Sequence, residues 1–313
     1  MDTQPQPTTA PEADWTRRPE RSNLPILRLM VWISLTLGRP IGRWVLHGVA
    51  AYFLAFAPAA RRASRTYLAR ALGRAPTLAD LFRHILTFAT TIHDRIYLLN
   101  GRFDLFDIRI VGEHFIRSSV AEGTGVLLMG AHFGSFEVLR ALGRKNLDIP
   151  VAMLMYEENA RKINATLSAI NPAATQDIIP LGRMESMLQA RDRLEAGHLV
   201  GMLADRGLGS DPTRDCDFLG AAAPLPLGPF RMAAMLRRPV LLMVGLHLGG
   251  NRYEIHFEPL ADFSAVERNG REAAIAAVQD RYVRRLEHFC RRAPYNWFNF
   301  FDFWNAPGRE PAP

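Results

Sequence analysis

Short apolar segments alternate with segments of helical periodicity along most of this chain. The apolar segments have the length of buried strands and are bounded by glycine, proline or polar residues, whereas the stretches between them repeat apolar residues every three or four positions. This alternation predicts an α/β fold with a mixed, largely parallel sheet flanked by helices. We expect strands at 105–111, 124–129, 149–155, 177–181, 199–204, 239–247 and 253–257, and helices at 77–100, 157–170, 184–196, 229–237 and 265–292.

The segment 124–144 carries the clearest chemical pattern. An apolar strand leads into a turn that contains His132, and helical spacing begins at Ser135, a candidate N-cap, so that Glu137 lies in or just past the first helical turn. A carboxylate within reach of one imidazole nitrogen orients the ring and stabilises the imidazolium that forms when the other nitrogen takes a proton. His132 and Glu137 are therefore candidates for a general base and its orienting acid. The alternative is a turn histidine that caps the helix.

A second polar cluster, Asp205 and Arg206, directly follows the apolar strand at 199–204. Carboxyl ends of parallel strands lie at one edge of a sheet, so we expect this cluster near His132. In the functional interpretation Arg206 binds a phosphate group, and Asp205 holds that group or a substrate hydroxyl. The alternative is an ion pair in a surface loop, which contributes little.

Three further positions are candidates for substrate binding. Arg183 stands in a loop before a helix, where it would contact a phosphate of the substrate or remain in solvent. Gly220 and Gly228 would allow the backbone to approach a ligand closely, because glycine has no Cβ. Alternatively, the two glycines only form turns.

Residues 24–60 contain two apolar runs separated by the basic positions around Pro40. Each run is shorter than the ~20 residues that cross a bilayer as a helix. We interpret the pair as a membrane-embedded or interfacial helical anchor, with one marginal span, and Trp32 and Trp44 suit the headgroup zone. The alternative is two buried core helices. The next segment would bind anionic lipid on the cytoplasmic side through five arginines, Arg61, Arg62, Arg65, Arg70 and Arg74.

The net charge of +7 comes almost entirely from arginine, because Lys145 and Lys162 are the only lysines. An arginine-rich surface suits an anionic membrane, an acidic protein or nucleic acid, although genomic base composition would have the same effect. The aromatic residues are not interleaved with the basic cluster, which argues against nucleic acid. Cys216 and Cys290 are too few for a disulfide framework, and neither metal-ligand spacing nor a nucleotide-binding motif occurs.

These observations divide the chain into four parts. Residues 1–22 are a proline-rich tail expected to be disordered, 23–75 are the apolar helices with their basic flank, 76–306 are the catalytic domain, and 307–313 are a tail. The aromatic segment 295–304 would either form an exposed lipid-binding patch or pack against the catalytic domain.

Three motifs carry a family resemblance: GAHFGSFE at 130–137, LADRG at 203–207, and FLGAAAPLPLGPFRMA beginning at Phe218. They resemble the lysophospholipid acyltransferase superfamily with its H-x4-D/E block, and most closely the bacterial lauroyl/myristoyl acyltransferases of lipid A biosynthesis. The resemblance runs from about Leu27 to Trp304. The C-terminal YNWFNFFDFW looks more like acyltransferases associated with aryl-polyene or related lipids.

The resemblance implies a glycerolipid acyltransferase-like fold and an O-acyltransferase. A fatty acyl group would pass from an acyl carrier protein thioester, or from acyl-CoA, to a hydroxyl of a lipid acceptor such as a lipid A precursor, another glycolipid or a lysophospholipid. His132 would be the general base and Glu137 its partner, with no metal and no cofactor besides the thioester co-substrate. The expected partners are acyl carrier protein, the lipid acceptor and the anionic surface of the bacterial inner membrane, with the catalytic domain on its cytoplasmic face. The alternative is a non-catalytic, membrane-peripheral lipid-binding or scaffolding protein that retains the fold.

Overall fold

A computed structural model describes residues 24–121, 123, 125–138, 150–156, 165–166, 168, 170–171, 177–181, 184–207 and 211–304. Within these residues a seven-stranded sheet has the order β1-β9-β8-β2-β5-β3-β4, and neighbouring strands run parallel except for β8 and β9. The predicted mixed, largely parallel sheet is therefore confirmed. Its strands are β1 (Asp107–Val111), β2 (Val126–Gly130), β3 (Val151–Tyr156), β4 (Asp177–Leu181), β5 (Leu199–Leu203), β8 (Pro239–His247) and β9 (Arg252–Asp262).

The central strand β2 is buried on both faces. Leu127 and Met129 contribute to the apolar cluster on the side of helix α10 (Arg271–Arg292), whereas Val126 and Leu128 contribute to a cluster on the opposite side. Side chains of a strand alternate between the faces of a sheet, and a parallel sheet covered on both faces reads as a continuous apolar run. This is why residues 124–129 show no polar alternation.

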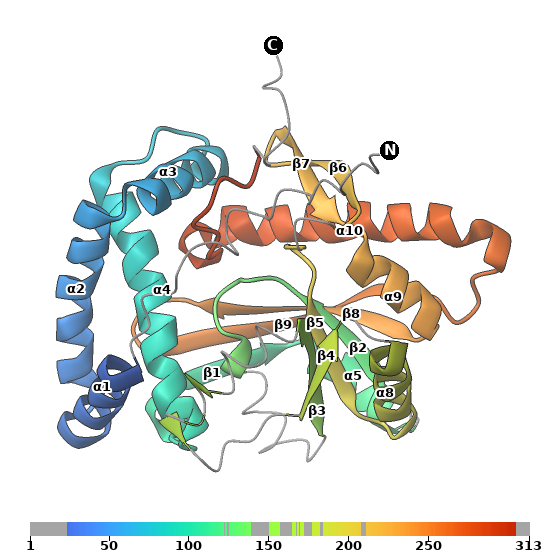
Figure 1. The fold of residues 1–313 in the computed structure, drawn as a ribbon, viewed down its shortest axis with the longest axis horizontal. Coiled ribbons are helices and arrows are strands. Elements are labelled where there is room, and N and C mark those ends of the chain that lie inside the picture. Colours follow the sequence, from blue (N-terminus) through green and yellow to red (C-terminus); the bar gives the residue numbers. More distant parts are fainter. Residues whose placement is uncertain are drawn as a thin grey trace, which may run out of the picture.

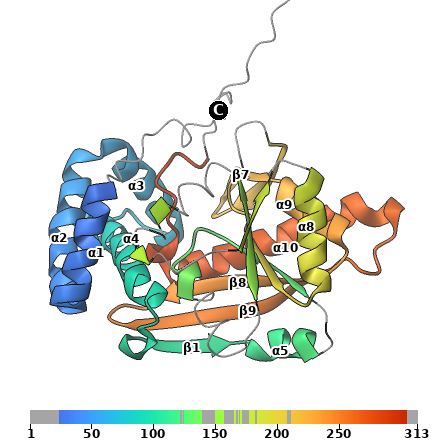
Figure 2. The same ribbon diagram turned by 60° about the horizontal axis from the view of Figure 1, so that its bottom comes forward.

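The helices α5 (Glu113–Ala121), α8 (Met184–Glu195) and α9 (Gly228–Leu236) complete the sheet domain with α10. Four further helices stand together at the left of Figures 1 and 2. They are α1 (Leu24–Leu37), α2 (Arg39–Phe56), α3 (Pro58–Leu72) and α4 (Leu78–Leu99). A Cβ at Gly42 of α2 would lie 2.3 Å from Nε2 of His93 on α4, so glycine is needed for this close packing of α2 on α4.

Within the apolar segment 24–60, helix α2 has one buried and one exposed face. On α2, Gly42, Leu46 and Ala50 are buried, while Trp44 is 78% and Phe56 is 68% exposed. Among the described residues, no helix is long and apolar enough to cross a membrane. The fold thus gives no support for a spanning anchor. The alternative prediction of two buried core helices is also wrong, because Trp44 and Phe56 of α2 are exposed.

The strands at 177–181 and 239–247 are confirmed at both ends, and the helix expected at 265–292 begins at Arg271. The helix expected at 157–170, and the helix that starts beyond Ser135, lie largely outside the described residues. The antiparallel hairpin of β6 (Thr213–Phe218) and β7 (Ala221–Pro226) was not predicted.

The C-terminal aromatic segment packs against the sheet domain, as the second interpretation predicted. Trp297 is fully buried, and Phe298, Phe303 and Trp304 are less than 10% exposed. The indole of Trp304 stacks on Phe218 and donates to its carbonyl. The segment is therefore part of the core, next to the ends of β2 and β5.

Candidate active site

His132 and Asp205 lie side by side because β2 and β5 are paired in parallel register. Gly130 is opposite Leu203, and His132 and Asp205 each come two residues later in their own chain segment. Nδ1 of His132 is 2.8 Å from Oδ1 of Asp205. A carboxylate can only accept hydrogen bonds, so this contact fixes the neutral imidazole with its proton on Nδ1 and leaves Nε2 free to accept one.

The Asp205 carboxylate is fully buried and has three donors. Besides the imidazole, the backbone N–H of His132 donates to Oδ2 at 3.1 Å and the indole Nε1 of Trp297 donates to Oδ2 at 3.0 Å. A buried charge is tolerated only where hydrogen bonds replace its hydration. Trp297 therefore orients Asp205, which in turn orients the imidazole of His132. This role of Trp297 was not predicted from the sequence.

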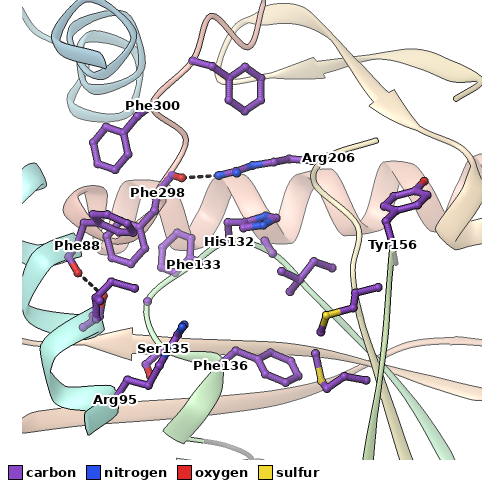
Figure 3. Close-up of a pocket in the computed structure, with 18 of the residues that line it drawn as sticks. Phe88, Arg95, His132, Phe133, Ser135, Phe136, Tyr156, Arg206, Phe298 and Phe300 are labelled. Atoms are coloured by element: carbon purple, nitrogen blue, oxygen red, sulfur yellow. Dashed lines mark hydrogen bonds between the residues drawn. The ribbon is translucent and has the colours of Figure 1, made fainter. Parts of the chain in front are cut away.

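The segment after Trp297 forms another wall of the site. The backbone N–H of Phe298 donates to the carbonyl of His132 at 2.8 Å, and the guanidinium of Arg206 donates to the carbonyl of Phe298. The same guanidinium lies over the ring of Phe301, 5.3 Å from its centroid. Figure 3 shows Arg206 extending across the site next to His132. Arg206 is thus placed at the site by protein contacts, with its Nε buried and without a hydrogen-bond partner among the described residues.

The His132 turn depends on Gly134. Its φ of +57° lies in the left-handed region, and a Cβ here would lie 1.6 Å from the carbonyl oxygen of Gly245. The flanking backbone is fixed by hydrogen bonds from Gly134 N–H to the carbonyl of Asn296 at 2.8 Å and from Ser135 N–H to that of Gly245 at 3.1 Å. Residues 136–138 are helical, so Ser135 occupies the expected position before the helix.

The charges at the site keep the imidazole neutral. Burial lowers the pKa of His132, and the charge of Arg206 lowers it further, while Asp205 opposes both effects without cancelling them. Burial would raise the pKa of Asp205, but the charge and hydrogen bonds of His132 and the charge of Arg206 bring it down to about 2. Burial lowers the pKa of Arg206 to about 10. At neutral pH the site therefore holds an ionised Asp205, a cationic Arg206 and a neutral His132.

The expected contact between Glu137 and the imidazole is not formed, because Asp205 occupies that position. Glu137 lies in the helix that follows the turn. Its Oε1 is 3.6 Å from Nε of Arg95 on α4. The correction follows from the pairing of the strands. The register of β2 and β5 brings Asp205 beside His132, although the two are 73 positions apart in the sequence.

His132 opens onto a cavity of about 550 Å³. Its walls are mostly apolar and come from α4, the His132 turn, β3 and the C-terminal segment, as Figure 3 shows. The polar exceptions include His132, Arg206, Arg95 and Tyr156, whose hydroxyl donates to Asp211 at 2.5 Å. Apolar residues of the wall include Phe88, Ile92, Phe133, Phe136, Met153, Met155, Phe298 and Phe300. A cavity of this kind suits an amphiphile with an extended apolar part.

Gly220 and Gly228, two of the remaining predicted site residues, do not line this cavity. Gly220 lies in the exposed turn between β6 and β7 with φ +76°, and Gly228 begins α9, where an added Cβ would meet open space. Arg183 lies outside the described residues. No group of three potential metal ligands occurs in the part of the chain that the structure describes. Arg95 and Phe88 line the cavity but were not predicted as site residues. Helical spacing predicts which residues share a face of α4, but it does not predict that this face borders a cavity.

Comparison with known protein families gives a match over nearly the whole chain. Residues 15–305 match the family model described as bacterial lipid A biosynthesis acyltransferase. No curated protein matches the chain. The matched range includes His132, Asp205, the cavity and the C-terminal aromatic segment. The chain therefore belongs to the bacterial lipid A biosynthesis acyltransferase family.

Proposed function

We propose that this protein is an O-acyltransferase that moves a fatty acyl group from a thioester, carried by acyl carrier protein or coenzyme A, to a hydroxyl of a lipid acceptor. The observation that carries the proposal is the imidazole of His132, which is bonded to Asp205 through Nδ1 and borders an apolar cavity. The lipid acceptor is a lipid A precursor, another glycolipid or a lysophospholipid. Family membership supports the acyl transfer itself.

In this mechanism Nε2 of His132 takes the proton of the acceptor hydroxyl as the oxygen attacks the thioester carbonyl. The imidazolium that forms is stabilised by the ionised Asp205. Collapse of the tetrahedral intermediate breaks the C–S bond, and the imidazolium returns the proton to the leaving thiolate. Acyl transfer is thus direct, and Cys216 and Cys290, which are both buried, take no part.

Arg206 is the candidate group for stabilising the tetrahedral oxyanion. It lines the cavity together with His132, and its position is fixed by the contacts with Phe298 and Phe301. A cation fixed in advance near the developing negative charge lowers the barrier without having to reorganise during the reaction. This assigns Arg206 to the transition state, where the sequence analysis had assigned it to a phosphate.

The apolar wall of the cavity would hold the acyl chain, and the N-terminal helices would bring the site to a membrane surface. Trp32, Trp44, Tyr52 and Phe56 are at least half exposed on α1 and α2. The basic helix α3 follows directly, so apolar insertion and attraction to anionic lipid act at neighbouring positions. An interfacial position on the cytoplasmic face of the bacterial inner membrane needs no helix that crosses it. The same basic helix would attract an acidic acyl carrier protein.

The proposal is tested by incubating the full-length protein with radiolabelled acyl-ACP or acyl-CoA and lipids extracted from a bacterial inner membrane. Transfer of label to a lipid, with release of the free thiol in equal amount, is the expected result. A protein that binds these lipids without transferring label to any of them would be the non-catalytic lipid-binding protein, and the proposal would be wrong.

A further inference from the structure

Arg95 introduces a cation into a wall of the cavity that is otherwise largely apolar. Helix α4 contributes Phe88, Thr91, Ile92 and Arg95 to this wall, which is the spacing of one helical face. In Figure 3 the Arg95 side chain reaches from α4 toward the turn at Ser135. Charged groups are seldom placed among apolar side chains unless they are paired, so the contacts of Arg95 need an explanation.

The protein itself only partly satisfies this guanidinium. The side chain is 24% exposed, and Nε is buried without a hydrogen-bond partner among the described residues. The nearest described acid is Glu137, whose Oε1 is 3.6 Å from Nε, a distance that gives charge attraction but not a hydrogen bond. Because the exposed part of this side chain borders the cavity, a ligand oxygen there would give the guanidinium a partner that the described residues do not supply.

Glu137 is placed to act on Arg95 and not on the imidazole. Its side chain is 8% exposed, and Nδ1 of His132 is already bonded to Asp205. Within the described residues, the acid of the H-x4-E pattern therefore forms its ion pair with α4. The negative charge of Glu137 keeps the long Arg95 side chain at the cavity. Without it, the side chain would turn toward solvent.

We propose that Arg95 binds an anionic oxygen group, a phosphate or carboxylate, of the amphiphile that occupies the cavity, and that Glu137 is the positioning residue for Arg95. A guanidinium matches both anions because its planar N–H groups bind two oxygens at once. The subsite lies on the cavity wall that α4 forms, so the apolar chain and the anion are recognised by the same surface. The proposal rests on the proposed function only for the identity of the amphiphile.

Calorimetry of the full-length protein with decyl phosphate and with decanol tests the binding step. Wild-type protein should bind decyl phosphate about tenfold more tightly or better, as expected for a charge-assisted hydrogen bond. Arg95→Gln should lower the ratio of the two affinities several-fold, although Arg206 remains as a second cation in the cavity wall. Arg117→Gln is the matched control, because Arg117 pairs with Glu113 in an exposed i,i+4 pair on α5, away from the cavity. Equal affinities in the wild type, or an unchanged ratio in Arg95→Gln, would overturn the proposal.

Kinetics separate the role of Glu137 from that of Asp205. Glu137→Gln should raise the KM of the substrate that carries the anion several-fold, leave the acid limb of the pH profile in place, and have no further effect in the Arg95→Gln background. Glu113→Gln is its control. A rise in the KM of the acceptor assigns the anion to the lipid headgroup, and a rise in the KM of the thioester assigns it to the donor. A shifted acid limb, or no rise in either KM, would contradict the proposal. Calorimetry needs no turnover, so an inactive protein would refute the proposed function and not this subsite.

Discussion

The indole Nε1 of Trp297 lies 3.0 Å from Oδ2 of Asp205, while Nδ1 of His132 lies 2.8 Å from Oδ1 of the same carboxylate. The acid is therefore held between a tryptophan near the C-terminus and the histidine after β2. Two side chains that fix opposite oxygens leave the carboxylate no freedom to rotate. The orientation of the imidazole depends on a residue that lies 92 positions beyond Asp205.

The Trp297→Phe variant tests this arrangement. It retains an aromatic ring but removes one donor from a buried carboxylate, which should lower kcat about tenfold through an increase of roughly 1–2 kcal/mol in the barrier. Trp304→Phe is the control, because the Trp304 indole is also buried but donates to the carbonyl of Phe218. Both variants should unfold at lower temperature. Equal kcat values in the two variants would show that Trp297 only fills space.

The pH dependence of kcat/KM tests the charges around His132. The proposed base, His132, must be neutral to act, so activity should fall as the pH falls through its pKa. Burial and Arg206 lower this pKa, so the acid limb should lie below the ordinary histidine value. Asp205 raises the pKa, so Asp205→Asn should move the limb to still lower pH, while the wrong tautomer lowers kcat by roughly a thousandfold or more. Arg206→Gln should move the limb upward. If the acid limb moved in the same direction in Asp205→Asn and in Arg206→Gln, this assignment of the charges would be contradicted.

The Gly134→Ala variant tests the geometry of the His132 turn. The added Cβ would meet the carbonyl oxygen of Gly245 at 1.6 Å, so the turn has to move and both stability and activity should fall strongly. Gly73→Ala is the control, because Gly73 has a similar φ of +65° with open space around it. That variant should lose only about 1–2 kcal/mol of unfolding free energy, the cost of the left-handed backbone. Similar thermal denaturation curves for the two variants would disprove the close approach.

Cosedimentation with phosphatidylglycerol vesicles tests the membrane surface of α1 and α2. Trp44→Ser and Phe56→Ser should each weaken binding about tenfold, because they remove large apolar groups that would leave water on insertion. Met235→Ser is the control, since Met235 is 54% exposed on α9 of the sheet domain. Raising the salt concentration should weaken binding further by screening α3. Unchanged binding by both α2 variants would place the membrane surface elsewhere.

The sequence predicted most of the sheet because buried parallel strands are continuous apolar runs. It missed the β6–β7 hairpin, where Asp215, Asp217 and Pro224 occupy positions typical of a loop. This hairpin is held by partners distant in sequence: Arg214 reaches Gln279 on α10, and Gln279 donates to the carbonyls of Leu225 and Pro226. The local sequence of the hairpin does not indicate these contacts with α10.

The positions of His132 and Asp205 after their strands could be predicted from the sequence, whereas the contacts of their side chains could not. His132 and Asp205 were placed at strand ends because glycine and polar residues interrupt apolar runs there. Which carboxylate bonds the imidazole depends on the register of β2 against β5, and the nearer acid in sequence, Glu137, was the wrong choice for that contact. The role of Trp297 had no local signal, because its partner lies across the fold.

The rate of acyl transfer by His132→Ala, measured in parallel with His84→Ala, shows whether the His132 imidazole is the base. His84 is fully buried on α4, where it contacts Ser64 and the carbonyl of Trp297, so its loss tests for damage to the fold. With labelled acyl thioester and lipid acceptor, His132→Ala should retain binding and melting temperature but lose at least a hundredfold in kcat. His84→Ala should be less stable while its folded fraction keeps substantial activity. Transfer by His132→Ala at the wild-type rate would show that this imidazole is not the base.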